Sequence, residues 1–307
     1  MCPKCGSVER ASQVTSRTGT WGCCVGTCKA QFSATAGTPL HRTRAPLTEG
    51  FLAIWLMVPS GAGRTSSTSS KGISGMDTES RVPARKLAEW LDVDYRTAWY
   101  MSHRIRRLLS DPDWRKLSGI VEADGHAVGA PRQMYVGGHK KPEDDYPGAG
   151  SGGSKRGLSH GRAVVLVATE RGGDVRVRRI AAHSSIEVGN AVRDLIEPSA
   201  HLVTNGLPAY RTVGPTTAEH VTVDHGRRRL SNGGGDHINT AEGPIFLFRR
   251  SVQGTWHWVS RKHLDAYTTE CAWRHNRRGV SAATAFIQAL GGLDAVPLGD
   301  RELVACG

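Results

Sequence analysis

The stretch GIVEADGHAV, residues 119–128, decides what kind of fold this chain is expected to adopt. Its apolar residues favour a buried strand, in which Glu122 and Asp124 lie two positions apart and point to the same side. A carboxylate is costly to bury unless it binds something positive, and Mg²⁺ is the economical partner for such a pair. An acidic residue at the exposed end of a strand is the simpler alternative.

Segments after this stretch complete an α/β pattern. The first two strand candidates that follow it are separated by Arg171-Gly172-Gly173, a hairpin-like gap, whereas the later ones are linked through a helical segment. This order predicts a mixed sheet with flanking helices rather than a purely parallel sheet. The strand candidates are RAVVLVATE (162–170), DVRVRRIAA (174–182), HLVTN (201–205) and EHVTVDH (219–225), and the helical segments are 184–198 and about 239–276.

Two further polar positions bear on a metal site. Asn205 stands at the lip of the strand candidate 201–205, where nucleotidyl-transfer enzymes often place a metal-binding carboxylate. Glu242 would lie in the first turn of a helix capped by Asn239 or Thr240, and a capping acid is its simpler interpretation. Phosphodiester chemistry needs two divalent ions about 3.5–4 Å apart. Asp124 is the natural bridge between them, so we expect residues 124, 205 and 242 to converge at one rim of the sheet.

The composition bounds the partners of the chain. The 307 residues include 40 Lys and Arg against 28 Asp and Glu, a formal net charge of +12. Such a surplus suits a polyanionic partner, although a merely basic soluble surface would give the same numbers. No run of 18 apolar residues occurs, so we expect no membrane span.

Five of the seven cysteines lie in the first 28 residues. The pairs Cys2-x2-Cys5 and Cys24-x3-Cys28 can close a tetrahedron of thiolates around Zn²⁺, which would supply the folding energy of so small a module. Cys23 is an alternative third ligand; we prefer Cys24 because it keeps the second pair closer together. An odd cysteine number favours metal binding in a reducing compartment over disulfides.

Two helical segments, VPARKLAEWL (82–91) and YRTAWYMSHRIRRLL (95–109), flank a three-residue turn. The pattern predicts a helix-turn-helix whose second helix enters a DNA major groove, or alternatively a helical hairpin with a solvated basic face. The expected apolar faces are Leu87, Trp90 and Leu91 on the first segment and Ala98, Met101, Ile105 and Leu108 on the second. The expected DNA contacts are Arg96, Arg104 and Arg107.

A basic block with interleaved aromatic residues spans residues 225–279, with ten Lys and Arg against four Asp and Glu. This mixture suits tracking of a DNA backbone and stacking against unpaired ends. Alternatively the tryptophans are core residues and the arginines a solvated face; for Trp273 we expect the core. His257 could orient a phosphate or be structural. The expected DNA contacts are Arg250, Arg261, Lys262, Arg277 and Arg278, with Arg249 placed near Glu242.

Taken together, these segments resemble the bacterial insertion-sequence DDE transposases of the ISXO type. The resemblance covers nearly the whole chain and is strongest in one long block at residues 254–278. It rests on CPKCGS, FSATAGTPLH, YRTAWYMSHRIR, GIVEADGHAVG, VTNGLPAYR, NTAEG and GTWHWVSRKHLDAYTTECAWRHNRR.

The resemblance implies an organisation in four parts. These are a zinc ribbon (1–45), a helix-turn-helix-like DNA-binding region (46–112), a ribonuclease H-like catalytic domain (113–290) and a C-terminal tail (291–307). It also implies Mg²⁺ or Mn²⁺ at the catalytic site and Zn²⁺ in the ribbon. The implied partners are double-stranded DNA, namely terminal repeats and target, and at least a second copy of the chain. We expect a bacterial cytoplasmic protein that is nucleoid-associated when bound to DNA and has no membrane partner.

The same resemblance assigns the catalytic positions. The first catalytic Asp falls on Asp124, and the third position on Glu242 with Asn239 as a polar assistant. Asp124 and Glu242 are thereby the expected Mg²⁺ ligands, and a basic residue falls on Arg249, where many members have Lys. The chain departs from the family pattern at Asn205, where T-D-G is usual, at Gly125, where an acid is usual, at Ala130, and at Val25, where a cysteine is usual.

Asn205 is the departure with the largest expected consequence. An amide is nearly isosteric with a carboxylate, but it is uncharged and offers a metal a single oxygen. A loss of about 4 kcal/mol of transition-state stabilisation corresponds to roughly a thousandfold in rate. Glu122 or Asp224 could substitute. We expect a transposase by architecture with an impaired active site; the alternative is a non-catalytic DNA-binding protein, either a decayed copy or a repressor of its own element.

Overall fold

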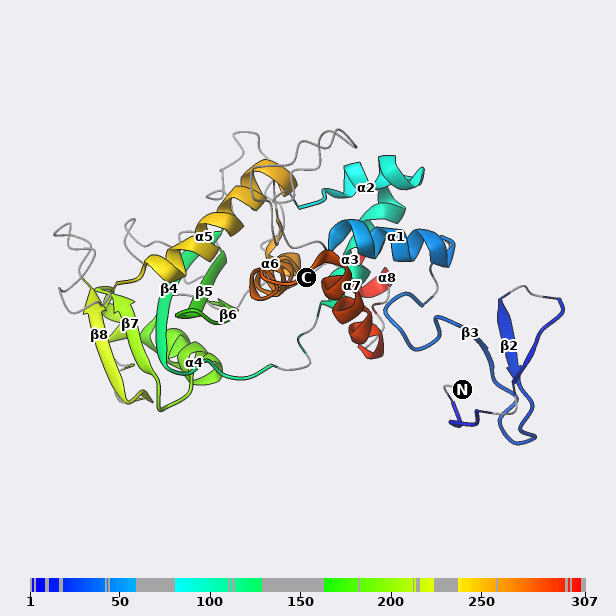
Figure 1. Ribbon diagram of the computed structural model, residues 1–307, viewed down its shortest axis with the longest axis horizontal. Helices are drawn as coiled ribbons and strands as arrows, with labels where there is room; N and C mark the ends of the chain where they lie inside the picture. Colours follow the sequence, from blue (N-terminus) through cyan, green and yellow to red (C-terminus); the bar gives the residue numbers. More distant parts are fainter. Residues whose placement is uncertain are drawn as a thin grey trace, which may run out of the picture. The chain divides into compact units, whose positions relative to one another are not determined.

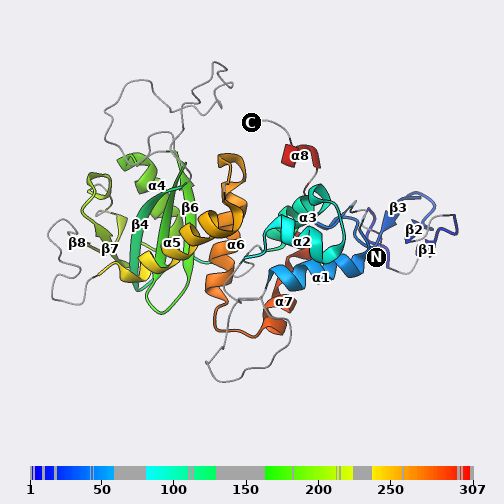
Figure 2. The same ribbon diagram turned by 90° about the horizontal axis from the view of Figure 1, so that it is seen from above.

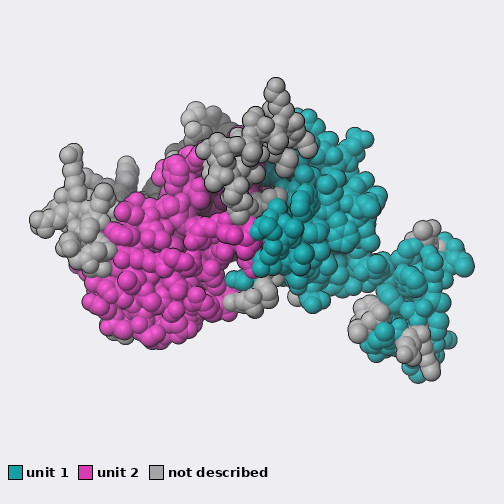
Figure 3. All heavy atoms as spheres, in the orientation of Figure 1, with its two compact units in different colours: residues 1–59, 82–112, 281–306 teal, residues 60–81, 113–280, 307 magenta. Residues whose placement is uncertain are grey.

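The computed structural model divides the chain into two compact units (Figure 3). Unit 1 comprises residues 1–59, 82–112 and 281–306, and unit 2 comprises residues 60–81, 113–280 and 307. The structure describes residues 2, 4–8, 11–16, 19–41, 43, 45–58, 81–109, 111, 114–128, 163–181, 183–211, 213, 216–223, 237–257, 259–295, 298 and 300–304.

Unit 1 begins with a small cysteine-bearing sheet. Strands β1 (Ala11–Gln13), β2 (Thr20–Cys23) and β3 (Gln31–Ser33) pair antiparallel in sequence order. Such a sheet buries little apolar surface, because even Trp21 in its central strand is 40% exposed. Its fold therefore needs a stabilising element other than a hydrophobic core.

The rest of unit 1 is helical. Its helices are α1 (Leu47–Met57), α2 (Ala84–Leu91), α3 (Tyr95–Leu108), α7 (Ala282–Leu290) and α8 (Asp300–Val304) (Figure 1). The two predicted segments are thus helices, and the turn between them contains Asp92 in the left-handed region (φ 51°). Asp94 caps α3, because its carboxylate accepts a hydrogen bond from Thr97 N at 3.0 Å.

The predicted apolar faces of α2 and α3 are mostly confirmed. Leu87 and Leu91 are buried, as are all four residues predicted on the second segment. Trp90 is the exception: it is 40% exposed, because it projects from the solvent side of α2. The period of 3.6 residues correctly identified the helices, but it wrongly assigned Trp90 to the buried face of α2.

Unit 2 contains the mixed sheet that the sequence predicts. Its strands are β4 (Ile120–Val128), β5 (Ala163–Glu170), β6 (Val175–Ile180), β7 (His201–Asn205) and β8 (Glu219–Val223), in the order β6-β5-β4-β7-β8. Strands β4, β5 and β6 pair antiparallel, whereas β7 and β8 run parallel to β4. The central strand β4 therefore lies within the stretch 119–128, which carries Glu122 and Asp124.

Helices cover both faces of this sheet (Figure 2). Helix α4 (Ser185–Leu195) packs Val188, Val192 and Leu195 on one face, against residues such as Ala123 and Leu202. Helices α5 (Asn239–Ser251) and α6 (Leu264–Asn276) pack on the other face, against Val165 and Val167. Because side chains alternate along a strand, the even-numbered residues of β4, including Asp124, face α5 and α6.

Short irregular turns connect the larger elements. They are the 3-10 turns η1 (Pro208–Tyr210), η5 (Arg261–His263) and η6 (Gly291–Asp294), and the π-helical turn η4 (Val252–Trp256), which extends α5. Within the described part of the chain, no helix combines the length and the apolar character needed to cross a membrane.

Candidate active site at the edge of β4 and β7

The register of the central strands brings Asp124 and Asn205 together. Strand β7 pairs parallel with β4, and Ala123 stands opposite Thr204. The next residue on each strand is a member of the pair, and Asn205 Nδ2 donates a hydrogen bond to Asp124 Oδ1 at 2.7 Å. Two residues that are 81 positions apart in sequence are thus in direct contact.

The backbone fixes which way round the Asn205 amide lies. Its Oδ1 accepts a hydrogen bond from Leu207 N at 3.2 Å, so the amide NH₂ faces Asp124. Asp124 Oδ1 also accepts from Gly125 N at 2.8 Å. An aspartate at position 205 would place a second carboxylate against the first, and only a cation or a shared proton makes such proximity stable. The amide here supplies the positive end of a dipole instead.

Tyr210 forms part of the surroundings of this pair. It lies on η1 just after β7, and only 1% of its surface is exposed. Burial and the charge of Asp124 raise the pKa of Tyr210 well above its ordinary value, so the phenol is neutral at any physiological pH. Its hydroxyl has no hydrogen-bond partner within the described structure. Asp124 therefore lies near a neutral polar group that could bond to a bound water or ligand.

Glu122, two residues before Asp124, is fully buried, and its positive partners are supplied by the protein. It accepts hydrogen bonds from Thr240 N at 2.7 Å and Ala241 N at 3.1 Å, the first amides of α5. Arg171 Nε lies 2.6 Å and His237 Nδ1 3.0 Å from its Oε1. Glu122 therefore does not need Mg²⁺ to balance its negative charge, because the N-terminus of α5 and the Arg171 guanidinium already do so.

Loss of the Glu122 charge should destabilise unit 2. Glu122→Gln leaves the Arg171 guanidinium without its carboxylate and weakens the cap of α5, so we expect a loss of about 3–5 kcal/mol in the free energy of unfolding. Urea denaturation followed by circular dichroism measures it. Glu219→Gln is the matched control, because that carboxylate is 61% exposed and its pair with His201 lies at the surface, so it should cost under about 1 kcal/mol. Equal effects of the two substitutions would refute the capping role.

Glu122 also determines where the third predicted position lies. By anchoring the first turn of α5 on β4, it places Asn239 and Glu242 over the strand that carries Asp124. Both side chains are exposed, and Glu242 N bonds to Ile238 O within the helix. In the described residues, Asp124 and Glu242 belong to no group of three or more His, Cys, Asp or Glu side chains whose ligand atoms converge.

The side-chain oxygens of Asp124, Asn205 and Glu242 do not suffice to hold a pair of divalent ions. Such a pair needs a bridging carboxylate and at least one further carboxylate for each ion. Asp124 can bridge, but its neighbour Asn205 offers a neutral amide whose oxygen is engaged with Leu207 N. That leaves Glu242 as the one further carboxylate that the predicted triad can offer. The three predicted positions thus offer two carboxylates and one amide.

Gly125 and His183 form a close contact that the sequence analysis missed. A Cβ added at Gly125 would lie 2.0 Å from His183 Nε2, so the imidazole occupies the place of a side chain. Burial lowers the pKa of His183, and its Nε2 has no hydrogen-bond partner within the described structure. His183 precedes α4, on the sheet face opposite Asp124. An acid at position 125, which the family pattern favours, would have to displace this ring.

Gly125→Ala should therefore destabilise unit 2 by about 1–3 kcal/mol, the usual cost of overpacking. His183→Ala should remove the clash, so the double variant should be more stable than Gly125→Ala alone. Urea midpoints of the four proteins give the coupling energy. If the double variant is no more stable than the single one, the contact is not the reason for glycine at this position.

The predicted DNA-contacting residues differ in accessibility. Arg104 is only 5% exposed, so its side chain would have to move to reach DNA, and its predicted DNA contact stays a prediction. Helix α3 buries residues on more than one side, since His103 and Arg106 are also buried. The predicted core position of Trp273 is confirmed, and Arg277 stacks on its ring at 4.5 Å. The exposed or half-buried members of the predicted set are Arg96, Arg107, Arg249, Arg250, Arg261, Lys262, Arg277 and Arg278.

The aromatic residues of the C-terminal block are largely structural. Trp256 packs edge-on against Tyr267 with ring centroids 4.5 Å apart, and both belong to the core beneath α5 and α6. His257 is exposed with an unusual φ of 58°, and its Nδ1 lies 3.1 Å from Gln253 O at the end of the π-helical turn. Trp258 and Asp224 lie outside the described residues, so a substituting role for Asp224 stays untested.

The cysteine module offers a second candidate metal site. The Sγ atoms of Cys2, Cys5, Cys23 and Cys28 all lie within 4.8 Å of one another, and two of the separations are 3.8 Å and 3.6 Å. A tetrahedron with Zn–S bonds of about 2.3 Å has S···S separations of about 3.8 Å. The four thiols therefore lie close to the spacing that Zn²⁺ requires.

Cys24, which the sequence analysis preferred, is not in this cluster. Its Sγ lies 3.3 Å from Ser12 Oγ and 3.8 Å from Gly22 O, on the exposed side of the sheet. Cys23 ends β2 in register with Ala11, and consecutive residues of an extended chain point to opposite faces. Cys23 therefore takes the place predicted for Cys24.

Comparison with known proteins supports one family. Residues 116–276 match the family model of the ISXO2-like transposase domain, which covers more than half of the chain. The matched segment includes all of the sheet and both helices of the α5 and α6 layer. No curated protein matches the chain.

Proposed function

The chain belongs to the ISXO2-like family of insertion-sequence transposases. We propose that the place where Asp124 of β4 meets Asn205 of β7 is its polynucleotidyl-transfer site, and that Asn205 impairs this site. The observation that carries this proposal is the hydrogen bond of 2.7 Å from Asn205 to Asp124. It unites two positions of the family's catalytic pattern at one point and shows an amide where the pattern has a carboxylate. Glu242, with Asn239 beside it, is the proposed third position.

The sheet supports a ribonuclease H-like fold for the proposed catalytic domain. Three antiparallel strands followed by two parallel ones, in the order β6-β5-β4-β7-β8, carry the site on the central strand. Helix α5 carries Glu242 and Arg249 on its exposed face, above the strand with Asp124. We propose that these segments, which are far apart in sequence, contribute to one active site of the DDE type.

The chain's own residues suggest how DNA is held. The net charge of +12 and the accessible arginines of α5 and of the segment after α6 favour a phosphate backbone. We propose that the zinc ribbon and the α2–α3 pair recognise terminal repeats, with Arg96 and Arg107 of α3 as contacts. At least two copies of the chain would assemble on paired ends. Target DNA is the second proposed nucleic-acid partner.

Mg²⁺ or Mn²⁺ would supply charge neutralisation and activation of the attacking oxygen when bound. The donors present do not complete a pair of ions, so we assign no catalytic step to this chain through them. Asp124 and Glu242 are the proposed remaining ligands, and Asn205 is a weakened third. Strand cleavage and strand transfer are the family's reactions, and this chain is proposed to perform them slowly.

A non-catalytic DNA-binding protein is the second candidate function. The neutral amide at position 205 favours it, because a protein that only binds DNA has no need of the lost carboxylate. Gly125, packed against His183, is a second departure at the same strand. Such a protein would be a decayed copy or a repressor of its own element.

Nicking of a terminal-repeat duplex in Mg²⁺ or Mn²⁺ separates the two candidates. The native chain should show slow nicking that Asp124→Ala abolishes, while both proteins bind the duplex equally in a gel-shift assay. Binding with no nicking above the Asp124→Ala background supports the non-catalytic candidate. Nicking that survives Asp124→Ala contradicts the proposed site.

A further inference from the structure

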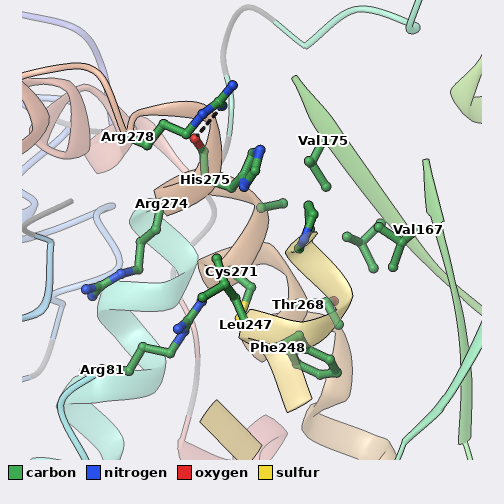
Figure 4. A pocket seen from close by; sticks show the side chains of 13 residues that line it. Arg81, Val167, Val175, Leu247, Phe248, Thr268, Cys271, Arg274, His275 and Arg278 are labelled. Atoms are coloured by element: carbon green, nitrogen blue, oxygen red, sulfur yellow. Dashed lines mark hydrogen bonds between the residues drawn. The ribbon is translucent and has the colours of Figure 1, made fainter. Parts of the chain in front are cut away.

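A pocket of about 180 Å³ opens within unit 2 between the sheet, α5 and α6 (Figure 4). Its walls are apolar: Val167 and Val175 come from the sheet, and Leu247 and Phe248 from α5. Cys271 of α6 also lines it, and burial raises the pKa of this thiol to about 11, so it presents a neutral group. An aliphatic and aromatic lining of this kind suits a flat apolar ring system.

Cationic groups stand on the opposite side of the pocket from the valines (Figure 4). Arg81 is 9% exposed, and its Nε has no hydrogen-bond partner within the described structure. Arg274 is compensated by Glu270, whose carboxylate lies 3.8 Å away, and Arg278 is exposed at the rim. An anionic group at this side would satisfy the buried Arg81 donor.

His275 adds a neutral polar group to the lining. Burial and the neighbouring charge of Arg278 lower its pKa to about 4, so the imidazole is uncharged at neutral pH. A neutral imidazole offers one donor and one acceptor. The pocket thus combines apolar walls, a neutral hydrogen-bonding edge and a cationic side.

The pocket adjoins the candidate active site. Val167 stands directly opposite Asp124 in the antiparallel register of β4 and β5. Cross-strand partners have Cβ atoms about 4.5–5.5 Å apart and lie on the same face. Pro244, which also lines the pocket, comes two residues after Glu242 on α5. A strand of DNA bound at Asp124 would therefore run close to the lining of the pocket.

We propose that this pocket receives the base of an unpaired nucleotide next to the strand bound at Asp124, with Arg81 on its phosphate. The inference rests on the proposed function and adds that the bound DNA has an unpaired base next to the reacting strand. A base has two apolar faces and a polar edge, as the lining requires, and its phosphate matches the cationic side. A paired base cannot enter, and unstacking costs least for a base that is already unpaired.

Duplexes with single-stranded ends test the inference on the zinc-loaded full-length chain. One duplex carries 2-aminopurine in its overhang, a second carries an abasic residue at the same place, and a third is blunt. We expect the native chain to bind the base-bearing overhang about tenfold more tightly than the abasic one, as base stacking gives elsewhere. Fluorescence of 2-aminopurine should change on binding.

A filled pocket should lose this preference. Ala272→Leu adds bulk to the lining and should bring the two overhang affinities within about twofold of each other, with blunt-duplex affinity unchanged. Ala218→Leu, at an exposed position before β8, is the matched control and should keep the preference.

Each outcome decides the inference. Equal affinity of the native chain for base-bearing and abasic overhangs overturns it without any variant, and a preference that persists in folded Ala272→Leu does the same. Failure to bind any of the three duplexes would instead contradict the proposed function. A chain that binds DNA but ignores the unpaired base leaves that function standing.

Discussion

The Asn205→Asp variant is expected to nick a terminal-repeat duplex about a thousandfold faster than the native chain, in Mg²⁺ or Mn²⁺. The substitution replaces the amide that donates to Asp124 with a carboxylate, so that the two side chains need a cation between them. About 4 kcal/mol of recovered transition-state stabilisation corresponds to that factor. Single-turnover cleavage of an end-labelled duplex measures the rate.

Two control variants test whether the gain in rate comes from a carboxylate at position 205 acting together with Asp124. Asn190→Asp places the same charge on the exposed side of α4, across the sheet from Asp124, and should leave the rate unchanged. The Asp124→Ala/Asn205→Asp double variant should be inactive, because it lacks the proposed bridging carboxylate. If Asn190→Asp accelerates nicking as much as Asn205→Asp does, the gain comes from general charge and not from the site.

Cys23→Ser should release zinc and unfold the N-terminal module, whereas Cys24→Ser should do neither. Structural zinc contributes an apparent free energy of about 10–16 kcal/mol in small modules, and this sheet has little core of its own. Metal content by atomic absorption and proteolysis of residues 1–45 measure the two effects. The variants differ by one position, yet only Cys23 has its Sγ within the cluster.

The result for Cys24→Ser is as informative as that for Cys23→Ser. Loss of zinc in Cys24→Ser with retention in Cys23→Ser would mean that the spacing argument was right and the geometry of the cluster wrong. Loss in both variants would indicate that the module is too unstable to tolerate either change, which the exposed side chain of Cys24 makes unexpected.

Local patterns in the sequence were sufficient for the strands and helices of unit 2. The apolar runs and the glycine gap after Glu170 predicted the mixed sheet, because hydrophobic periodicity and turn residues act over a few positions. The choice between Cys23 and Cys24 was different. It depends on which face of β2 each side chain occupies, and a strand shift of a single residue reverses the answer.

Contacts between distant segments could not be predicted in the same way. Nothing near Glu122 indicates that Arg171 and the first turn of α5 compensate it, since Thr240 lies 118 positions later. The burial of Arg104 likewise depends on tertiary packing and not on the helical period. His183 belongs to none of the motifs quoted for the resemblance, although Gly125 directly after Asp124 was a signal that another side chain fills the space.

Binding of Mn²⁺ to the zinc-loaded protein, measured by calorimetry, tests most directly the claim that Asn205 weakens a metal site at Asp124. We expect weak Mn²⁺ binding by the native chain, binding at least tenfold tighter by Asn205→Asp, and loss of that gain in the Asp124→Ala/Asn205→Asp double variant. Tight Mn²⁺ binding by the native chain that Asp124→Ala abolishes would contradict it.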